Sequence, residues 1–326
     1  MTEAPVSSPH WHNQASVSRL MLDVIYALLP AIVCYSWLFG WGLLLQCLLA
    51  VLFAVSLEYL ILKLRRRDPR LFLSDGSAVV TALLFALTIS PLTPWWLSLL
   101  GIAFAIVVVK HLFGGIGYNI FNPAMAGYVF ILVSFPAQMT LWPLPLSLVQ
   151  HEPSLPDVLS GATALGELKT ALGNMGMVSE VMTGDAFGHF AAAGWEWVNL
   201  CYLLGGLYLL ARGAIKWHIP LAVLAGVFIS SAIFYVYDPD LYASPLFHLS
   251  GGATIICAFF IATDPVSAAA TGKGRLIYGF LIGVLLYVIR QWGIYPDGAA
   301  FAVLLANALV PLIDSQTRPR VFGEQV

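Results

Sequence analysis

Long apolar runs alternate with short polar connections along the chain. The runs fall at 20–39, 41–62, 76–93, 95–113, 123–141, 195–211, 217–237, 249–263, 276–292 and 298–314. A transmembrane helix needs about 20 predominantly apolar residues. The pattern therefore predicts an all-α polytopic membrane protein with about ten spans, and the short run at 249–263 predicts a broken helix. The connection at 142–194 is long and polar, and it separates two groups of five runs.

Composition agrees with this pattern. Of the 326 residues, 60% are hydrophobic and 10% are charged, with a mean hydropathy of +0.85, whereas about 25% of a soluble domain is charged. The partner expected from composition is the lipid bilayer, and no nucleic acid is expected. The four cysteines stand apart without a C-x-x-C pair, so we expect neither a metal nor an iron–sulfur cluster. The first 20 residues lack the features of a signal peptide.

The basic residues predict the orientation. Thirteen of the 15 Lys and Arg residues would lie on one side of the membrane, and only Lys169 and Arg290 on the other. Positive residues favour the cytoplasmic side, and an even number of spans puts both termini on the same side. We therefore expect cytoplasmic termini and an external 142–194 loop, periplasmic in a bacterial inner membrane. Glu58 lies deeper in its span, where an acid is a functional candidate, and the alternative is that it is an interfacial neighbour of Lys63.

Two segments resemble each other at an offset of 175 residues. Gly76 to Thr88 and Gly251 to Thr263 share glycine, alanine, phenylalanine and threonine at matching positions. Because five spans per repeat is an odd number, two such repeats must be inverted in the membrane. The expected domains are a cytoplasmic tail 1–19, a first repeat 20–141, an external loop 142–194, a second repeat 195–314 and a cytoplasmic tail 315–326.

The external loop contains the pattern D-x-x-S-G-A-T, formed by Asp157, Ser160, Gly161, Ala162 and Thr163. Small neighbours leave the Thr163 hydroxyl open to another enzyme. The alternative is that Ser160 or Thr163 caps a helix through 164–169, and the two are compatible because a helix N-terminus also favours a phosphate. The near match at 250–254 has His248 where the pattern has aspartate and opens an apolar span, so Thr254 is interpreted as structural.

This pattern resembles the flavinylation motif of the family that contains the D subunit of Rnf complexes and the B subunit of sodium-pumping NADH:quinone oxidoreductases. The resemblance implies FMN joined through its phosphate to the hydroxyl of Thr163 by a separate flavin transferase. Segments 74–84, 110–124 and 262–267 also resemble the family, so the likeness covers nearly the whole chain. The short polar segment before the first span favours the D type.

A second, non-covalent flavin, riboflavin, is implied by the same resemblance near Asn119, Asn122 and Asp264. The glycines at 114–117 allow irregular backbone at membrane depth. Amide and carboxylate groups supply hydrogen-bond donors and acceptors for a flavin. The alternative is that the asparagines cap a helix begun by Pro123 and that Asp264 accepts backbone hydrogen bonds in its turn.

The resulting functional hypothesis is a membrane electron-transfer subunit of an ion-translocating oxidoreductase. The complex would couple NADH and ferredoxin redox chemistry to ion translocation, with subunits A, B, C, E and G as partners. No nicotinamide fingerprint is present and no catalytic residue is assigned, so the chain has no complete active site of its own. One alternative is the quinone-reductase B subunit. Another, from a different class, is a channel or solute transporter with inverted repeats.

Overall fold

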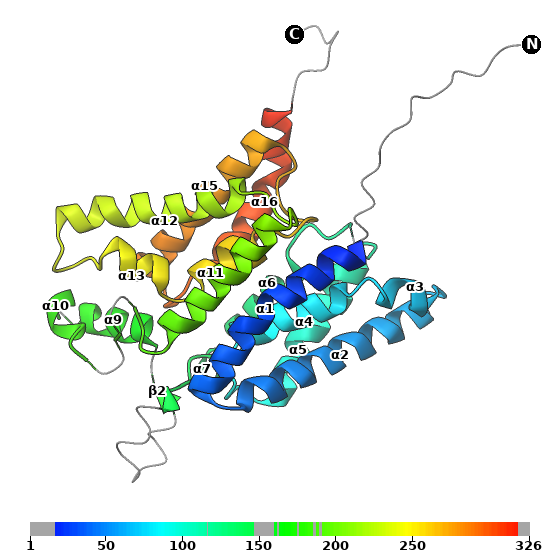
Figure 1. Ribbon diagram of the computed structural model, residues 1–326, viewed down its shortest axis with the longest axis horizontal. Helices are drawn as coiled ribbons and strands as arrows, with labels where there is room; N and C mark the ends of the chain where they lie inside the picture. The colour runs from blue at the N-terminus through cyan, green and yellow to red at the C-terminus, as the bar shows by residue number, and fades with distance from the viewer. Residues whose placement is uncertain are drawn as a thin grey trace, which may run out of the picture.

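The computed structural model describes residues 17–318 except for 116, 147–159, 162, 175, 185–186 and 189–190. Asp157 and Ala162 of the flavinylation pattern lie outside the described residues. Ser160 and Gly161 are described only as backbone. The described chain is mostly helical (Figure 1), as the apolar pattern predicts.

The first half of the chain, as described between residues 17 and 134, is a succession of helical elements. They are α1 (Val17–Phe39), α2 (Gly42–Leu64), α3 (Pro69–Leu73), α4 (Ser77–Thr88), α5 (Trp95–Ala103), the π-helix η1 (Phe104–Leu112) and α6 (Pro123–Ser134). The short helix α7 (Pro136–Met139) follows. Gly114, Gly115 and Gly117 have φ values of 132°, 109° and 89°. The predicted irregular backbone between η1 and α6 is therefore confirmed.

The second half, residues 195–317, has a similar order of elements. They are α11 (Trp195–Ala211), α12 (His218–Tyr237), α13 (Pro245–Ser250), α14 (Thr254–Ile256), the π-helix η3 (Cys257–Ile261), α15 (Gly272–Trp292) and α16 (Ala299–Thr317). In both halves two long helices precede a short helix, a further short helical segment (α4 in the first half, α14 with η3 in the second) and two more helical segments. The short run at 249–263 is broken, as predicted, because α13 ends at Ser250 and α14 starts at Thr254.

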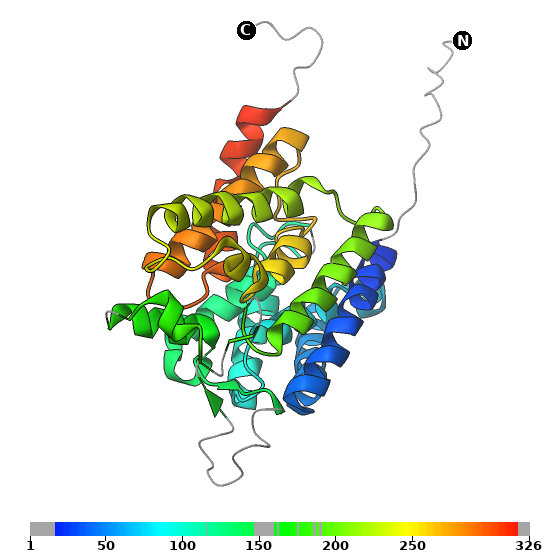
Figure 2. The same ribbon diagram turned by 60° about the vertical axis from the view of Figure 1, so that its left-hand side comes forward.

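The segment between the halves carries short elements in its described residues. They are β1 (Trp142–Pro143), β2 (Ser160–Gly161), α9 (Ala164–Gly173) and α10 (Val178–Val181). β1 and β2 pair antiparallel, with Trp142 opposite Gly161. Figures 1 and 2 place α9 and α10 at one end of the helix bundle, opposite the end where α1 begins and α16 finishes.

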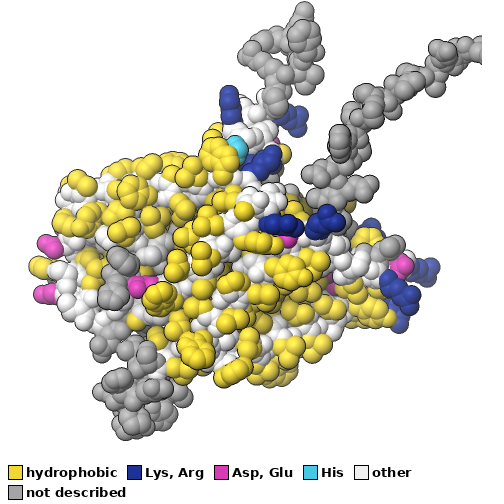
Figure 3. Space-filling view, in the orientation of Figure 1, with side chains coloured by type: hydrophobic (Ala, Val, Ile, Leu, Met, Phe, Trp, Pro, Cys, Tyr) yellow, Lys and Arg dark blue, Asp and Glu magenta, His cyan; other side chains and the backbone are white. Residues whose placement is uncertain are grey.

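Among the described residues, six helical segments are long and apolar enough to cross a membrane. They are Val17–Phe39, Gly42–Leu64, Trp95–Leu112, His218–Tyr237, Gly272–Trp292 and Ala299–Thr317. The other four predicted spans coincide with shorter elements, α4, α6, α11 and α14 with η3. The chain is thus a multi-pass membrane protein. The face seen in Figure 3 is largely hydrophobic, and Lys and Arg gather on it near the start of α1, the α2–α3 connection and the end of α16.

Close helix contacts hold the bundle together. The first helices of the two halves, α1 and α11, pack against each other, and so do α12 and α15. Gly205 permits the first contact, because a Cβ there would collide with the carbonyl oxygen of Ala27. A Cβ on Gly283 would collide in the same way with the carbonyl oxygen of Val223. Small residues allow such approaches between membrane helices.

Candidate functional site

Thr163 occupies the N-terminus of α9. Its backbone is extended (φ −65°, ψ 153°), and its Oγ1 accepts a hydrogen bond from Gly166 N at 3.1 Å. The predicted helix after Thr163 is therefore confirmed, with Thr163 as its cap. The first N–H groups of a helix and its dipole both favour an anion at this end.

A cavity of about 440 Å³ opens beside Thr163. We call it the outer cavity. Small-molecule sites usually occupy about 300–1,000 Å³, so it is large enough for a ring system. Its walls come from the first half, the second half and the segment between them. Among the residues that line it are Tyr128, Trp142, Thr163, Trp195, Tyr202 and Tyr295.

Aromatic side chains form one wall of the outer cavity. The rings of Trp142 and Trp195 meet edge to face with centroids 5.5 Å apart, and Trp195 also contacts Tyr35 at 5.0 Å. The pairing of β1 with β2 carries Trp142 to the backbone of Gly161, two residues before Thr163. Tyr202 is buried, and its hydroxyl has no hydrogen-bond partner among the described residues. This wall therefore offers aromatic surface to a ligand.

The helix that carries Thr163 is anchored to the second half of the chain. Leu165 and Leu168 are buried in a cluster with Val178, Ala243 and Phe247. Lys169 Nζ donates hydrogen bonds to the carbonyl oxygens of Arg290 at 2.9 Å and Tyr295 at 3.2 Å. These contacts fix α9 along the edge of the outer cavity.

An ion pair between the buried Arg290 and the partly exposed Asp297 lies beside the outer cavity. The Arg290 side chain is 1% exposed and approaches Asp297 Oδ1 to 3.2 Å. Arg290 also donates to the carbonyl oxygens of His248 and Gly251, and Asp297 accepts from Ala253 N at 2.7 Å. These bonds satisfy the backbone where the α13–α14 helix breaks.

Thr254, the near match to the flavinylation pattern, is fully buried. Its Oγ1 donates to the carbonyl oxygens of His248 at 2.7 Å and Gly251 at 3.0 Å. The interpretation of Thr254 as structural is confirmed, because its hydroxyl is used within the helix break.

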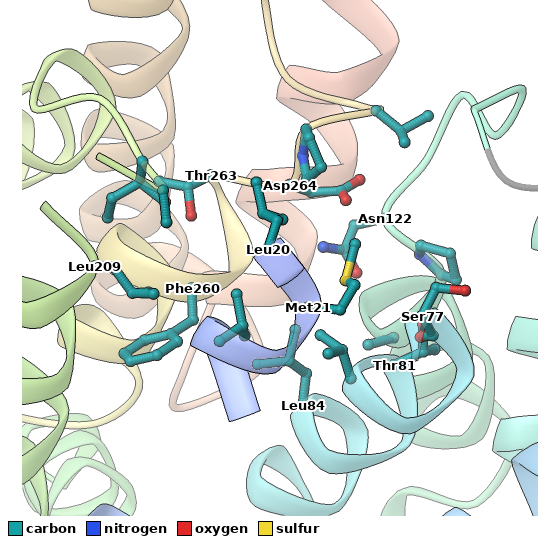
Figure 4. Close-up of a pocket in the computed structure, with 18 of the residues that line it drawn as sticks. Leu20, Met21, Ser77, Thr81, Leu84, Asn122, Leu209, Phe260, Thr263 and Asp264 are labelled. Atoms are coloured by element: carbon teal, nitrogen blue, oxygen red, sulfur yellow. Dashed lines mark hydrogen bonds between the residues drawn. The ribbon is translucent and has the colours of Figure 1, made fainter. Parts of the chain in front are cut away.

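Asn119, Asn122 and Asp264 come together around a second cavity, of about 80 Å³, which we call the inner cavity. Figure 4 shows Asn122 and Asp264 facing each other above Met21 and Leu84. The two asparagines precede α6 and the aspartate follows η3, so the two halves meet here. The predicted neighbourhood of the three residues is therefore present.

The polar atoms at the inner cavity already have partners within the chain. Asn122 caps α6 by accepting from Met125 N at 3.2 Å, and it donates to the carbonyl oxygen of Ile261 at 3.1 Å. Asn119 donates to the carbonyl oxygen of Phe121, and Asp264 accepts from Ser267. The alternative interpretation, in which Asn122 caps the helix begun by Pro123, is therefore confirmed for Asn122. The inner cavity is also smaller than usual ligand sites, and the second flavin stays a prediction.

One buried charged cluster was not predicted. Glu58 Oε1 accepts from Lys110 Nζ at 2.6 Å and lies 3.3 Å from His111 Nε2. Lys110 Nζ also donates to Ser77 Oγ at 2.7 Å. The interpretation of Glu58 as a neighbour of Lys63 is wrong, since its partner comes from η1. The sequence showed a glutamate and a lysine in separate apolar runs. Because they are 52 residues apart, the sequence did not indicate that they form an ion pair.

The fold and the outer cavity define a helical multi-pass membrane protein with a threonine hydroxyl at the mouth of an aromatic cavity. Residues 5–323 match the model of the NQR2, RnfD, RnfE family. The chain belongs to this family, as the sequence motifs indicated.

Relatives match the chain over nearly its whole length. The chain is 48% identical over 343 residues to a protein of Aliivibrio salmonicida, covering 98% of both chains. It is 50% identical over 341 residues to a protein of Aeromonas hydrophila, covering 97% of both. A protein of Vibrio cholerae serotype O1 is 48% identical, with 97% of this chain and 98% of the relative covered. Each of these relatives is named as the D subunit of an ion-translocating oxidoreductase complex.

Proposed function

We propose that this chain is the D subunit of an ion-translocating oxidoreductase complex and carries electrons within the membrane. End-to-end similarity to three relatives of that name supports the proposal. The chain would act with subunits A, B, C, E and G. It would receive electrons from these partners and take part in coupling NADH and ferredoxin redox chemistry to ion translocation.

The cofactor in this proposal is FMN, esterified through its phosphate to Thr163. The observation that carries it is the position of Thr163, at a helix N-terminus on the edge of a 440 Å³ cavity. The first N–H groups of α9 would hold the phosphate. The rings of Trp142, Trp195 and Tyr202 would enclose the isoalloxazine and keep water from it. When bound, FMN supplies the electron-carrier chemistry, and the protein supplies position and electrostatics.

The proposed architecture is two inverted five-span repeats in a bacterial inner membrane. The matching order of elements in the two halves supports the repeat. The gathering of Lys and Arg at the end of the bundle opposite α9 supports cytoplasmic termini and a periplasmic 142–194 loop (Figure 3). The flavin transferase would then reach Thr163 from the periplasm.

A non-covalent riboflavin at the inner cavity completes the proposal. The convergence of Asn119, Asn122 and Asp264 from both halves supports a binding place there. Their internal hydrogen bonds and the small cavity mean that local helix ends would have to move to admit a flavin.

The covalent link is tested by replacing Thr163. The chain is expressed with its flavin transferase, and the denatured protein is inspected for fluorescence on a gel and by intact mass. Wild type should carry one FMN, whereas Thr163→Ala and Thr163→Val should carry none. Thr163→Ser keeps a hydroxyl and should retain some label.

Thr170→Ala is the matched control, because Thr170 is an exposed threonine on the same helix. It should be labelled like wild type. A fluorescent Thr163→Val band would contradict the assignment of Thr163. A colourless wild-type protein would contradict the electron-carrier function and favour a transporter.

A further inference from the structure

Lys169 is the only lysine, arginine or histidine among the described residues that line the outer cavity. It lies on α9, the helix that Thr163 caps. Lys169 therefore lines the same cavity as Thr163, whose hydroxyl is proposed to carry FMN. No sequence motif marked this residue as part of a site.

Among the described residues, backbone carbonyl oxygens hold the Lys169 ammonium, and no carboxylate pairs with it. Two of its three N–H donors reach the carbonyl oxygens of Arg290 and Tyr295. The described part of the chain gives it no ion pair with any carboxylate. The structural explanation is that Lys169 caps the C-terminal end of α15. That role uses two of the three N–H donors of the ammonium group and does not account for the third.

The surroundings of Lys169 favour a negative charge nearby. Burial holds the pKa of its ammonium below the usual value, because the group loses water and gains no opposite charge. Asp297 also lines the outer cavity, but its carboxylate is taken up by Arg290 and by the N–H groups of Ala253 and Ala299. An anionic group in the cavity would therefore meet one cation that has no carboxylate partner in the described part of the chain.

We infer that Lys169 stabilises negative charge on the ligand of the outer cavity and thereby raises its reduction potential. This inference rests on the proposed FMN. An oxidised isoalloxazine that takes two electrons and one proton becomes an anion. In the complex the electrons would come from a reduced redox centre of a partner subunit. In the test they come from dithionite, and the proton comes from water.

The test measures the midpoint potential of the covalent flavin in the purified full chain by anaerobic dithionite titration. Lys169→Gln keeps N–H donors for the two carbonyls but removes the charge. It should shift the ratio of reduced to oxidised flavin at least tenfold toward oxidised, about 30 mV for a two-electron couple. Lys169→Arg keeps the charge and should stay much closer to wild type.

A second neutral variant and a distant control complete the design. Lys169→Met keeps the apolar stem without donors and should shift the potential in the same direction as Lys169→Gln. Lys273→Gln removes an exposed lysine that does not line the outer cavity and should leave the potential unchanged. If only the α15 cap mattered, Lys169→Met would lower stability while both neutral variants kept the wild-type potential.

The outcomes separate this inference from the proposed function. A fluorescent gel band with wild-type potential in both neutral variants overturns the role of Lys169 and leaves FMN on Thr163 intact. Absence of the band from wild type overturns the proposed cofactor and the role of Lys169 with it. A lowered potential in the neutral variants that Lys169→Arg largely restores supports the inference.

Discussion

Loss of Lys110 should destabilise the protein strongly, and simultaneous loss of Glu58 should restore much of the stability. Lys110 Nζ and Glu58 Oε1 are 2.6 Å apart, and the two side chains are 4% and 2% exposed. Glu58 lies on the candidate span Gly42–Leu64, so water does not compensate a charge left there. Lys110→Met would leave the Glu58 carboxylate with His111 alone.

The expected magnitude follows from the burial of both charges. Removing one partner of a buried ion pair costs about 3–5 kcal/mol, whereas replacing both by apolar groups of similar volume is often neutral. Lys110→Met and Glu58→Leu should therefore each cost about that much. The double variant should lose clearly less than the sum. The coupling free energy of the cycle should be on the order of 3 kcal/mol in favour of the pair.

The assay is thermal unfolding of the purified chain in one detergent, with the covalent-flavin band as a check on assembly. Lys63→Met is the matched control, since Lys63 is an exposed lysine on the same helix as Glu58. It should change stability by less than about 1 kcal/mol. Additive losses in the double variant, or an equal loss in the control, would refute the buried-pair reasoning.

Three further changes test the fold, the inner cavity and the orientation. Gly205→Val should prevent the close packing of α1 on α11, so little monodisperse protein should appear in size-exclusion chromatography. The control is Gly213→Ala, because a Cβ at Gly213 meets open space. This control should remain monodisperse, although the positive φ of Gly213 should cost it some stability. Asn122→Leu and Asp264→Leu should lose most acid-releasable flavin yet keep the fluorescent band; wild type that releases none would leave the asparagines as helix caps. A cysteine placed at Ser154, outside the described residues, should react with a membrane-impermeant thiol reagent in cells whose outer membrane alone has been opened. Labelling that requires lysis of the inner membrane would overturn the predicted orientation.

The apolar pattern predicted where helices occur better than it predicted their length. The long runs at 20–39 and 41–62 became the 23-residue helices α1 and α2, and α1 continues through Pro30. The run at 76–93 became the 12-residue helix α4, which starts after Gly76 at φ 76° and ends at Thr88. Hydropathy averages over such boundaries, whereas glycine and proline end helices locally.

The candidate site was predictable only where its residues are neighbours in the sequence. Thr163 was identified from its pattern, and Asn122 as a cap from the proline that follows it. The outer cavity joins Tyr128, Trp142, Thr163, Tyr202 and Tyr295, which are far apart in the chain. Because no sequence pattern links these residues, the packing of the two halves was needed to assign them to one cavity.

The distribution of Lys and Arg along the sequence also bears on the outer cavity. Only Lys169 and Arg290 were predicted on the outer side, against the preference of basic residues for the cytoplasm. The structure brings these two together, since Lys169 Nζ bonds the carbonyl oxygen of Arg290. The Arg290 guanidinium bonds the broken α13–α14 backbone and Asp297, and Lys169 lines the cavity beside Thr163. A basic residue on the outer side of the membrane opposes the preference of such residues for the cytoplasm, so we expect a local interaction that requires it there. For Arg290 the reason is the helix break, whose carbonyl oxygens it satisfies, and for Lys169 it is the pair of carbonyl oxygens at the end of α15.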